Sequence, residues 1–532
     1  MTTRDWTSWP VHHVLIAAYP ILYLVSSNVG EVNPQEALVP LAVSIGVALA
    51  LFAVLRFAGV SARRSAFVVS VLAVVTLLFG RVAGAVEPLG FSGLPLLAGW
   101  LLLALAVIVI MAFSRTDLRG VTAVMNIGSA VLVGFTVVGI GGYIVNEPGA
   151  FLGGQPVDVD GSGAPTESPD GTPGTPPRDI YYFVLDGYGA PRAVDQYLDV
   201  QPRLMDSLEA SGFSVLHETH SNYRSTVLSL SSTLNMMYLD EVAARYGTEN
   251  PHQHPLYELI RNAESIQFLK ERGYSYVLLG SDFNITATSP LADVNPVFEQ
   301  TSDFMGVLIE STILPSVVSL AGVEDDLTDR RRRYDATMWQ LETFPELARL
   351  PGPKFVFTHF LVPHPPRVMD EDGGYVSADA EADRPPVERF RAQWAFVDRE
   401  IEELIEGLLA GPDETDPIII ISPDHGPTTP GMPQTGPNID WGSANDAQLD
   451  LVFSIASAYH LPGLDESCLY PGMSSVNAFR LVFNLYFDAG LPLLPDRSFL
   501  HTRVGRPYDL TEVTDRLPDS GAGSETETTC DP

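Results

Sequence analysis

The sequence predicts an N-terminal all-α transmembrane bundle of five helices, followed by an α/β sandwich with a mainly parallel central sheet. Two observations support this prediction. Residues 1–145 are rich in Leu, Val, Ala, Ile and Gly, whereas the remaining residues have the composition of a soluble protein. From residue 178 onwards, apolar runs typical of buried strands alternate with helical patterns. With 532 residues, the chain is long enough for more than one domain.

Five apolar stretches have about the length of a membrane-crossing helix, roughly 20 residues. The first is the weakest, because it is short and contains Pro20. A signal peptide is the alternative for this stretch, but no clear small-x-small cleavage site accompanies it and four more stretches follow. The five predicted spans are Val14–Asn28, Ala37–Leu55, Ala66–Val86, Leu94–Phe113 and Val121–Val145.

Loop charges predict the orientation of these spans. The loops on one side contain six arginines, and the short loops on the other side contain only Arg81 with three glutamates. The positive-inside rule therefore places the N-terminus in the cytoplasm, and five crossings place everything after Val145 outside. Ionisable residues are almost absent from the spans, which favours an anchor over a transporter or proton channel. The six arginines are Arg4, Arg56, Arg63, Arg64, Arg115 and Arg119.

Charge and composition divide the rest of the chain. The formal net charge is −34, and almost all of it lies after residue 145, which argues against nucleic acid as a partner. Residues 146–177 are mostly Pro, Gly, Ser, Thr and Asp and predict a disordered linker. Residues 178–510 form the predicted catalytic domain, and residues 511–532 a disordered tail.

The predicted strands and helices of the soluble part alternate along the chain. In sheets built this way, ligands gather just beyond the carboxyl ends of the strands. The predicted helices are Arg203–Ser211, Thr226–Tyr238 and Arg389–Leu409. The predicted strands are Asp179–Leu185, Tyr274–Leu279, Lys354–His359 and Pro417–Ser422.

Acidic and imidazole side chains follow three of these strands. Asp186 follows the first strand, His359 and His364 follow the third, and Asp424 and His425 follow the fourth. Such side chains would converge on one rim of the sheet, which predicts a metal site. The plainer alternatives are a turn or helix cap at Asp186 and a rigid proline loop after His364.

Four segments, in order, resemble the signature segments of the alkaline phosphatase–sulfatase superfamily. The first metal-binding strand of these enzymes resembles DIYYFVLDGYG, and their nucleophile helix resembles SNYRSTVLSLSSTLNMMYL. The third and fourth segments resemble FVFTHFLVPHPP and IIIISPDHGP. The membrane anchor followed by this domain is similar to lipoteichoic acid synthases and phosphoethanolamine transferases. The resemblance implies an α/β sandwich of alkaline phosphatase/sulfatase type.

The resemblance also implies a metal-ligand set. Asp186 matches the first acidic ligand, and Asp424 and His425 match the second acidic ligand and the imidazole ligand. Thr226 matches the nucleophile, which is also a ligand. Mixed oxygen and nitrogen ligands suit Zn²⁺ or Mn²⁺ better than Ca²⁺ or Mg²⁺. A complete second metal site is not evident, because the later His460 and His501 match no ligand position, so we expect one divalent ion.

The remaining histidines have an implied role in substrate binding. His364 matches the imidazole near the transferred group, and His359 lies five residues earlier, as in the transferases. A cation lowers the pKa of a threonine hydroxyl so that it can attack phosphorus. For Thr226 the alternative role is helix capping, since serines and threonines surround it.

The chain departs from two branches of the superfamily. Sulfatases carry Cys or Ser followed by x-Pro-x-Arg, which is oxidised to formylglycine, whereas this chain has Thr226-Val-Leu-Ser-Leu. We therefore expect no formylglycine. Phosphoethanolamine transferases carry several disulfides in this domain, and this chain has only two cysteines.

These features together predict a membrane-anchored, metal-dependent phospho-group transferase of the cell envelope. It would move a phospho-alcohol group from a lipid donor to a cell-surface glycan or lipid acceptor through a phospho-threonine intermediate. A phosphodiesterase, phosphatase or other sulfatase-like hydrolase would have nearly the same active site. The non-enzymatic alternative is a membrane-anchored surface protein whose site has decayed, although every implied ligand position holds a competent residue.

Overall fold

The computed structural model describes most of the chain, which forms two compact units. The first unit combines Met1–Gln155 with Thr301–Asp329, and the second combines Pro156–Gln300 with Arg330–Pro532. The predicted linker, apart from residues 146 and 177, lies outside the described residues. The described residues are 9–29, 34–86, 93–114, 117–146, 177–298, 303–320, 329–411, 416–427, 441–463, 469–503 and 505–518.

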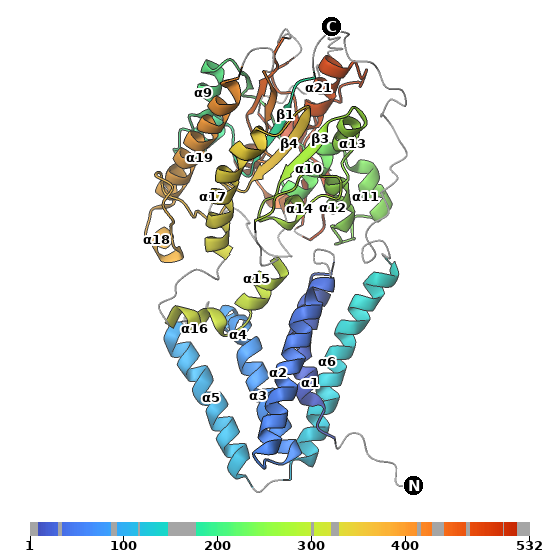
Figure 1. Cartoon of the computed structure of the whole chain (residues 1–532), viewed down its shortest axis with the longest axis vertical. Helices are drawn as coiled ribbons and strands as arrows, with labels where there is room; N and C mark the ends of the chain where they lie inside the picture. The colour runs from blue at the N-terminus through green and yellow to red at the C-terminus, as the bar shows by residue number, and fades with distance from the viewer. Residues whose placement is uncertain are drawn as a thin grey trace. The chain divides into compact units, whose positions relative to one another are not determined.

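The first unit is all helical in its described part (Figure 1). Its helices follow the five apolar stretches closely, and two further helices come from the later segment. Their bounds are α1 (His12–Ser27), η2 (Pro34–Ala37), α2 (Leu38–Phe57), α3 (Ala62–Leu77), α4 (Phe79–Val86), α5 (Gly93–Phe113), α6 (Arg119–Asn146), α15 (Asp303–Glu310) and α16 (Leu314–Leu320).

Three stretches of the first unit are long and apolar enough to cross a membrane: Gln35–Phe57, Gly93–Met111 and Arg119–Gly142. Helices α3 and α4 pass the same test as a pair, although the chain bends by 53° between them. Helix α1 has only 16 residues, about 24 Å at 1.5 Å per residue, which is shorter than a hydrocarbon core of roughly 30 Å. The count of five spans therefore remains a prediction.

Residues 301–329 belong to the first unit, although they lie inside the region predicted as one continuous catalytic domain. Helix α15 buries Phe304 and Leu308 in one apolar cluster with side chains of α1. The backbone N–H of Gly80, in α4, donates to the carbonyl of Ser311 at 3.0 Å. Sequence reasoning did not find this grouping, because it depends on contacts between residues more than 200 positions apart.

The second unit contains the alternating elements that the sequence predicts. Each predicted strand and helix is present, with ends displaced by three residues or fewer. The bounds are β1 (Ile180–Leu185), α8 (Pro191–Leu198), α9 (Leu204–Ala210), β2 (Ser214–Leu216), α10 (Thr226–Asn235), α11 (Asp240–Tyr246), α12 (His254–Arg261), α13 (Glu264–Glu271), β3 (Ser275–Leu279), α14 (Asn284–Ala287), α17 (Asp329–Ala348), β4 (Lys354–Phe360), α18 (Ala378–Ala382), α19 (Pro386–Leu409), β5 (Ile418–Ile421), η5 (Trp441–Ser443), α20 (Asp446–Phe453), β6 (Ser457–His460), η7 (Ser475–Asn477), α21 (Ala478–Phe487), β7 (Phe499–His501), β8 (Leu510–Glu512) and η8 (Thr514–Arg516).

The central sheet of the second unit is mixed, with strand order β2-β6-β5-β1-β4-β3. The pairs β5–β1, β1–β4 and β4–β3 are parallel, as the apolar runs predict. Strand β6 pairs antiparallel with both β5 and β2. Because β6 reverses direction, the prediction of a mainly parallel sheet holds only for the four neighbouring strands β5, β1, β4 and β3.

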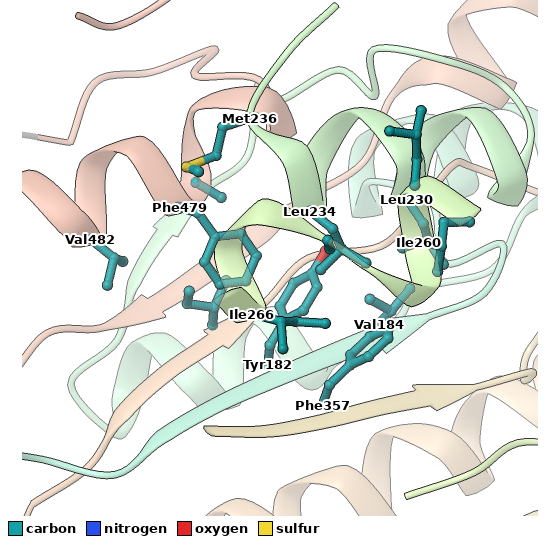
Figure 2. Close-up of a cluster of buried hydrophobic side chains, with 14 of the residues drawn as sticks. Tyr182, Val184, Leu230, Leu234, Met236, Ile260, Ile266, Phe357, Phe479 and Val482 are labelled. Carbon is teal, nitrogen blue, oxygen red and sulfur yellow. The ribbon is translucent and has the colours of Figure 1, made fainter. Parts of the chain in front are cut away.

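Helices cover both faces of this sheet, with α9, α17 and α19 on one side and α10, α12, α13 and α21 on the other (Figure 1). Alternate residues of β1 divide between the two faces: Tyr182 and Val184 belong to one apolar cluster, and Tyr181 and Phe183 to the other. In the first cluster, Leu234 of α10 packs near Tyr182, and Leu230 lies beside Ile260 (Figure 2). This packing fixes the position of α10 over the strand ends.

The folded part of the chain extends further than predicted at its C-terminal end. Residues 511–518 belong to the predicted disordered tail, yet β8 pairs antiparallel with β7. Val513 and Leu517 are buried in a small cluster with Trp441. The short sequence carries too little periodicity to signal this packing. Residues 519–532 of the predicted tail lie outside the described residues.

Candidate metal centre

The ends of three parallel strands bring three of the predicted ligands, Asp186, Asp424 and His425, together with His359. Asp186 directly follows β1, and Asp424 comes three residues after β5 ends. His359 lies within β4 rather than after it, because the strand continues to Phe360. Phe357 precedes His359 by two residues and faces the cluster under α10, so His359 points to the same side of the sheet.

Asp186 is the centre of the group. Its two carboxylate oxygens lie 3.7 Å from His359 Nε2 and 3.5 Å from His425 Nε2. The same nitrogen of His425 lies 3.4 Å from Asp424 Oδ2. One ligand atom from each of Asp186, His359 and Asp424 lies within 4.8 Å of the other two. His359, predicted to bind substrate, therefore also has the geometry of a ligand.

The hydrogen bonding of this group fits a bound cation. Asp186 Oδ1, Asp424 Oδ2 and His359 Nε2 are buried and have no hydrogen-bond partner among the described residues. The two acids are 5% and 3% exposed. Buried carboxylates this close together need positive charge to offset the cost of leaving water. Two carboxylates with one or two imidazoles form a donor set suited to a divalent metal.

The outer nitrogens of the imidazoles are held by neighbouring groups. Nδ1 of His425 donates to the carbonyl of Gly426 at 2.8 Å, which leaves Nε2 as the acceptor in the neutral ring. Nδ1 of His359 is 3.0 Å from the hydroxyl of Thr286. Burial lowers the pKa of His359 to about 4, so this ring is neutral at pH 7. Such outer contacts orient metal ligands.

The charge on His425 is set by opposing effects. Burial acts to lower its pKa, but the carboxylates of Asp424 and Asp186 raise the pKa above the ordinary value of histidine. A metal cation bound at the same place would interact with the same two carboxylates. The acids therefore attract positive charge to this point of the fold.

His364 also lies at this rim. Its backbone N–H donates to the carbonyl of Asp186 at 3.0 Å, and its ring centre is 6.1 Å from that of His425. Nδ1 of His364 donates to the carbonyl of Pro365 at 2.7 Å. Burial lowers the pKa of His364. The structure therefore brings His364 beside the acidic group.

Helix α10 places Thr226 at the same rim. Thr226 is the first residue of the helix, and Ser229 lies one turn later on the same face. The hydroxyl of Ser229 donates to the carbonyl of Asp424 at 2.6 Å, which attaches the first turn of α10 to the metal-ligand loop. Ser225, at the N-cap position, makes no side-chain capping hydrogen bond. The first turn can therefore face an anion.

Two further residues lie here that sequence reasoning did not select. Arg224 precedes Thr226 by two residues, and its Nη2 lies 2.5 Å from Nε2 of His501. The guanidinium lies 3.9 Å from the ring centre of Trp441. Burial lowers the pKa of Arg224 to about 9, so it remains a cation at neutral pH. Proximity to Thr226 was the only sequence signal for Arg224, and His501 had none.

Comparisons with known proteins find similarity in solved structures only. No protein-family model matches the chain, and no curated protein matches it. The integral membrane protein lipooligosaccharide phosphoethanolamine transferase A from Neisseria meningitidis is 14% identical, with a TM-score of 0.40, covering 89% of this chain and 95% of that one. The C-terminal periplasmic domain of EcEptC from Escherichia coli is also 14% identical, with a TM-score of 0.41, covering 67% and 98%.

A protein of the alkaline phosphatase superfamily from Vibrio parahaemolyticus is 12% identical, with a TM-score of 0.37, covering 65% of this chain and 78% of that chain. The solved structures similar to this chain thus include phosphoethanolamine transferases and a member of the superfamily that the four sequence segments resemble.

Proposed function

We propose that the chain is a membrane-anchored, metal-dependent enzyme of the alkaline phosphatase superfamily that transfers a phospho-alcohol group outside the cytoplasm. The buried group of Asp186, Asp424, His359 and His425 beside the first turn of α10 is the observation that carries this proposal. Two buried carboxylate oxygens without hydrogen-bond partners among the described residues, the imidazoles and the uncapped N-terminus of α10 form a site for a cation and an anionic substrate.

Asp186, Asp424 and His425 would hold one divalent ion, with Thr226 as a further ligand. His359 is a second candidate for the imidazole ligand, because its Nε2 also lies near a carboxylate oxygen of Asp186. A divalent ion bound here would lower the pKa of the Thr226 hydroxyl and offset charge on phosphoryl oxygens. Zn²⁺ or Mn²⁺ suits the mixed ligands.

The reaction proceeds in two displacements at phosphorus. The hydroxyl oxygen of Thr226 forms a bond to phosphorus, the bond to the lipid alcohol breaks, and the lipid alcohol leaves with a proton. An acceptor hydroxyl on a surface glycan or lipid then attacks phosphorus and releases Thr226 as the free hydroxyl. His364 binds the phosphoryl oxygens during both steps. Water as the acceptor would make the same site a phosphodiesterase.

The location follows from the anchor. The five predicted crossings, with the N-terminus in the cytoplasm, would place the second unit outside, where both a lipid donor and an envelope acceptor are available. The three apolar stretches that qualify as spans by length and composition support a membrane protein. A reporter enzyme that folds actively only outside the cytoplasm, fused after residue 518, is expected to be active.

Peptide mass spectrometry tests the mechanism. The full chain, held in lipid nanodiscs with Mn²⁺ or Zn²⁺, is incubated with membrane phospholipids and then digested. We expect a phospho-alcohol adduct on the peptide that contains Thr226, and its mass identifies the transferred group. Thr226→Ala abolishes the adduct, whereas Ser231→Ala, whose hydroxyl contacts Leu256 instead, keeps it. Full turnover by Thr226→Ala would reject Thr226 as the nucleophile.

A further inference from the structure

Arg224 is held by an aromatic ring and an imidazole and not by an acid. Its guanidinium lies over the ring of Trp441, and Nη2 is hydrogen-bonded to His501. Both partners are buried and neither carries a negative charge. No carboxylate of the described residues forms an ion pair with Arg224, and its Nε is buried without a hydrogen-bond partner. A partly buried cation without an acid gains stability when an anion approaches it.

Other arginines of the same unit show the contrast. Arg192 makes hydrogen bonds to both carboxylate oxygens of Asp450. Arg333 makes the same kind of pair with Asp282. Arg272 and Arg367 also stack on aromatic rings with a buried, unpartnered Nε. Arg224 differs from these two arginines in its position, because it lies two residues before Thr226 at the start of α10.

The backbone directs Arg224 towards the metal centre. Ser225 is extended, with φ −125° and ψ 142°, so the side chains of Arg224 and Thr226 project to the same side of the chain. Thr226 begins α10, whose first turn is attached to the Asp424 carbonyl through Ser229. A group bound at the helix N-terminus therefore lies within reach of the guanidinium.

We propose that Arg224, stacked on Trp441 and oriented by His501, forms an anion subsite beside the metal centre that binds a non-bridging phosphate oxygen of the substrate. This inference rests on the proposed function and assigns part of its substrate recognition to a residue outside the metal-ligand set. Stacking on Trp441 fixes the plane of the guanidinium and leaves its edge to donate to oxygen. Arg224 is the substrate-binding residue, whereas His501 and Trp441 are positioning residues.

The chemistry of the subsite favours one class of substrate. A planar guanidinium matches the oxygens of phosphate and hydrogen-bonds them in pairs. An anionic phosphodiester would gain this interaction, whereas a neutral carboxylic ester would not. The site therefore selects phospho-substrates before any step at Thr226 occurs.

Binding of inorganic phosphate to the full chain in nanodiscs tests this subsite without relying on turnover. Isothermal titration calorimetry compares wild type, Arg224→Gln and Arg224→Lys, and the Arg272→Gln control removes an arginine that stacks on Phe268 at the end of α13. We expect Arg224→Gln to weaken phosphate binding roughly 10- to 100-fold, the equivalent of one charged hydrogen bond. Arg272→Gln would bind as wild type does.

The Arg224→Lys variant guards against loss of folding, because it keeps the positive charge. We expect roughly 10-fold weaker phosphate binding for it, since lysine cannot make the paired contact. If His501 positions the guanidinium, His501→Leu weakens phosphate binding. His501→Gln keeps a hydrogen-bond acceptor and should bind phosphate more tightly than His501→Leu does. Unchanged phosphate affinity in Arg224→Gln and Arg224→Lys would overturn the subsite and leave Arg224 with a packing role only.

A turnover assay separates this inference from the proposed function. With bound metal and bis(p-nitrophenyl) phosphate as the probe, Arg224→Gln is expected to lower kcat/KM roughly 100-fold while the bound-metal content stays the same. Turnover by wild type but equally by Arg224→Gln would remove the subsite and keep the function. Phosphate binding that depends on Arg224 without any turnover of phosphodiesters would keep the subsite and remove the function.

Discussion

Replacing Asp424 by Asn is expected to make the protein more stable than wild type without metal and less stable than wild type with metal. In the metal-free protein, Asp424 and Asp186 are two buried carboxylates with ligand atoms within 4.8 Å of each other. At an effective dielectric of about 20, like charges at that distance repel by about 3 kcal/mol. Asp424→Asn removes the repulsion and keeps the acceptor for the Gly187 N–H, so the metal-free variant is expected to be more stable than the metal-free wild type.

The metal-bound protein shows the opposite order. Wild type gains about 2.7 kcal/mol of unfolding free energy at a free metal concentration 100 times the dissociation constant. Asn is a weaker ligand than a carboxylate, so Asp424→Asn gains little from the same metal. The variant is therefore more stable than wild type in chelator and less stable in excess Zn²⁺ or Mn²⁺.

Differential scanning calorimetry of the full chain in nanodiscs measures this reversal. The relevant transition is the one that shifts with metal in wild type, and it should move by roughly 2 °C per kcal/mol for a large domain. Asp195→Asn is a matched control, because this acid lies in α8 and its carboxylate contacts Gln201 rather than the metal centre. If Asp424→Asn lowers the midpoint equally with and without metal, the two acids do not form a cation site.

Three further predictions concern other parts of the chain. Burial raises the pKa of Asp398 to about 6 from 3.8. The protonated carboxyl therefore stabilises the folded protein by about 3 kcal/mol below pH 4, and this contribution is lost as the pH rises through 6. In Asp398→Asn the denaturation midpoint should change less between pH 4 and 6 than it does in wild type. Gly80→Ala places a methyl group 1.9 Å from the carbonyl oxygen of Glu310, so limited proteolysis should cut α15 or α16 faster. Ser229→Ala releases the first turn of α10 from the metal-ligand loop and should weaken metal binding roughly 10-fold, measured with a competing chelator dye.

Each of these has a control within the chain. Gly84 lies in the same helix as Gly80, and a Cβ there would meet nothing within 4 Å, so Gly84→Ala should leave the cleavage pattern unchanged. Ser231→Ala removes a hydroxyl that contacts Leu256, so it should lower stability without changing metal affinity. A steep pH dependence that persists between pH 4 and 6 in Asp398→Asn would assign the titration to another group.

Local patterns in the sequence predicted most of the second unit. The four predicted strands are present because runs of apolar residues such as Ile418–Ile421 have no stable place except a buried sheet. The metal-ligand candidates were found for the same reason: Asp186 and Asp424 follow buried strands, where polar side chains gather at one rim. These inferences depend on neighbours in sequence, which a single chain displays directly.

Tertiary contacts decided the remaining features. The antiparallel direction of β6, the burial of Val513 and the pairing of His501 with Arg224 each depend on residues far apart in sequence. Because β4 pairs with β1, His359 lies beside Asp186 as a second imidazole.

The amino-acid sequence by itself determined the division of the chain into an apolar N-terminal part and a soluble part, the strands of the soluble part, and the residue types of the metal centre. Hydrophobic periodicity and side-chain chemistry are local properties. Only the tertiary structure decided that residues 301–329 pack with the first unit and that Arg224 has no acid beside it. The physical reason is that burial and charge pairing are properties of the surroundings, which long-range packing creates and no single stretch of sequence contains.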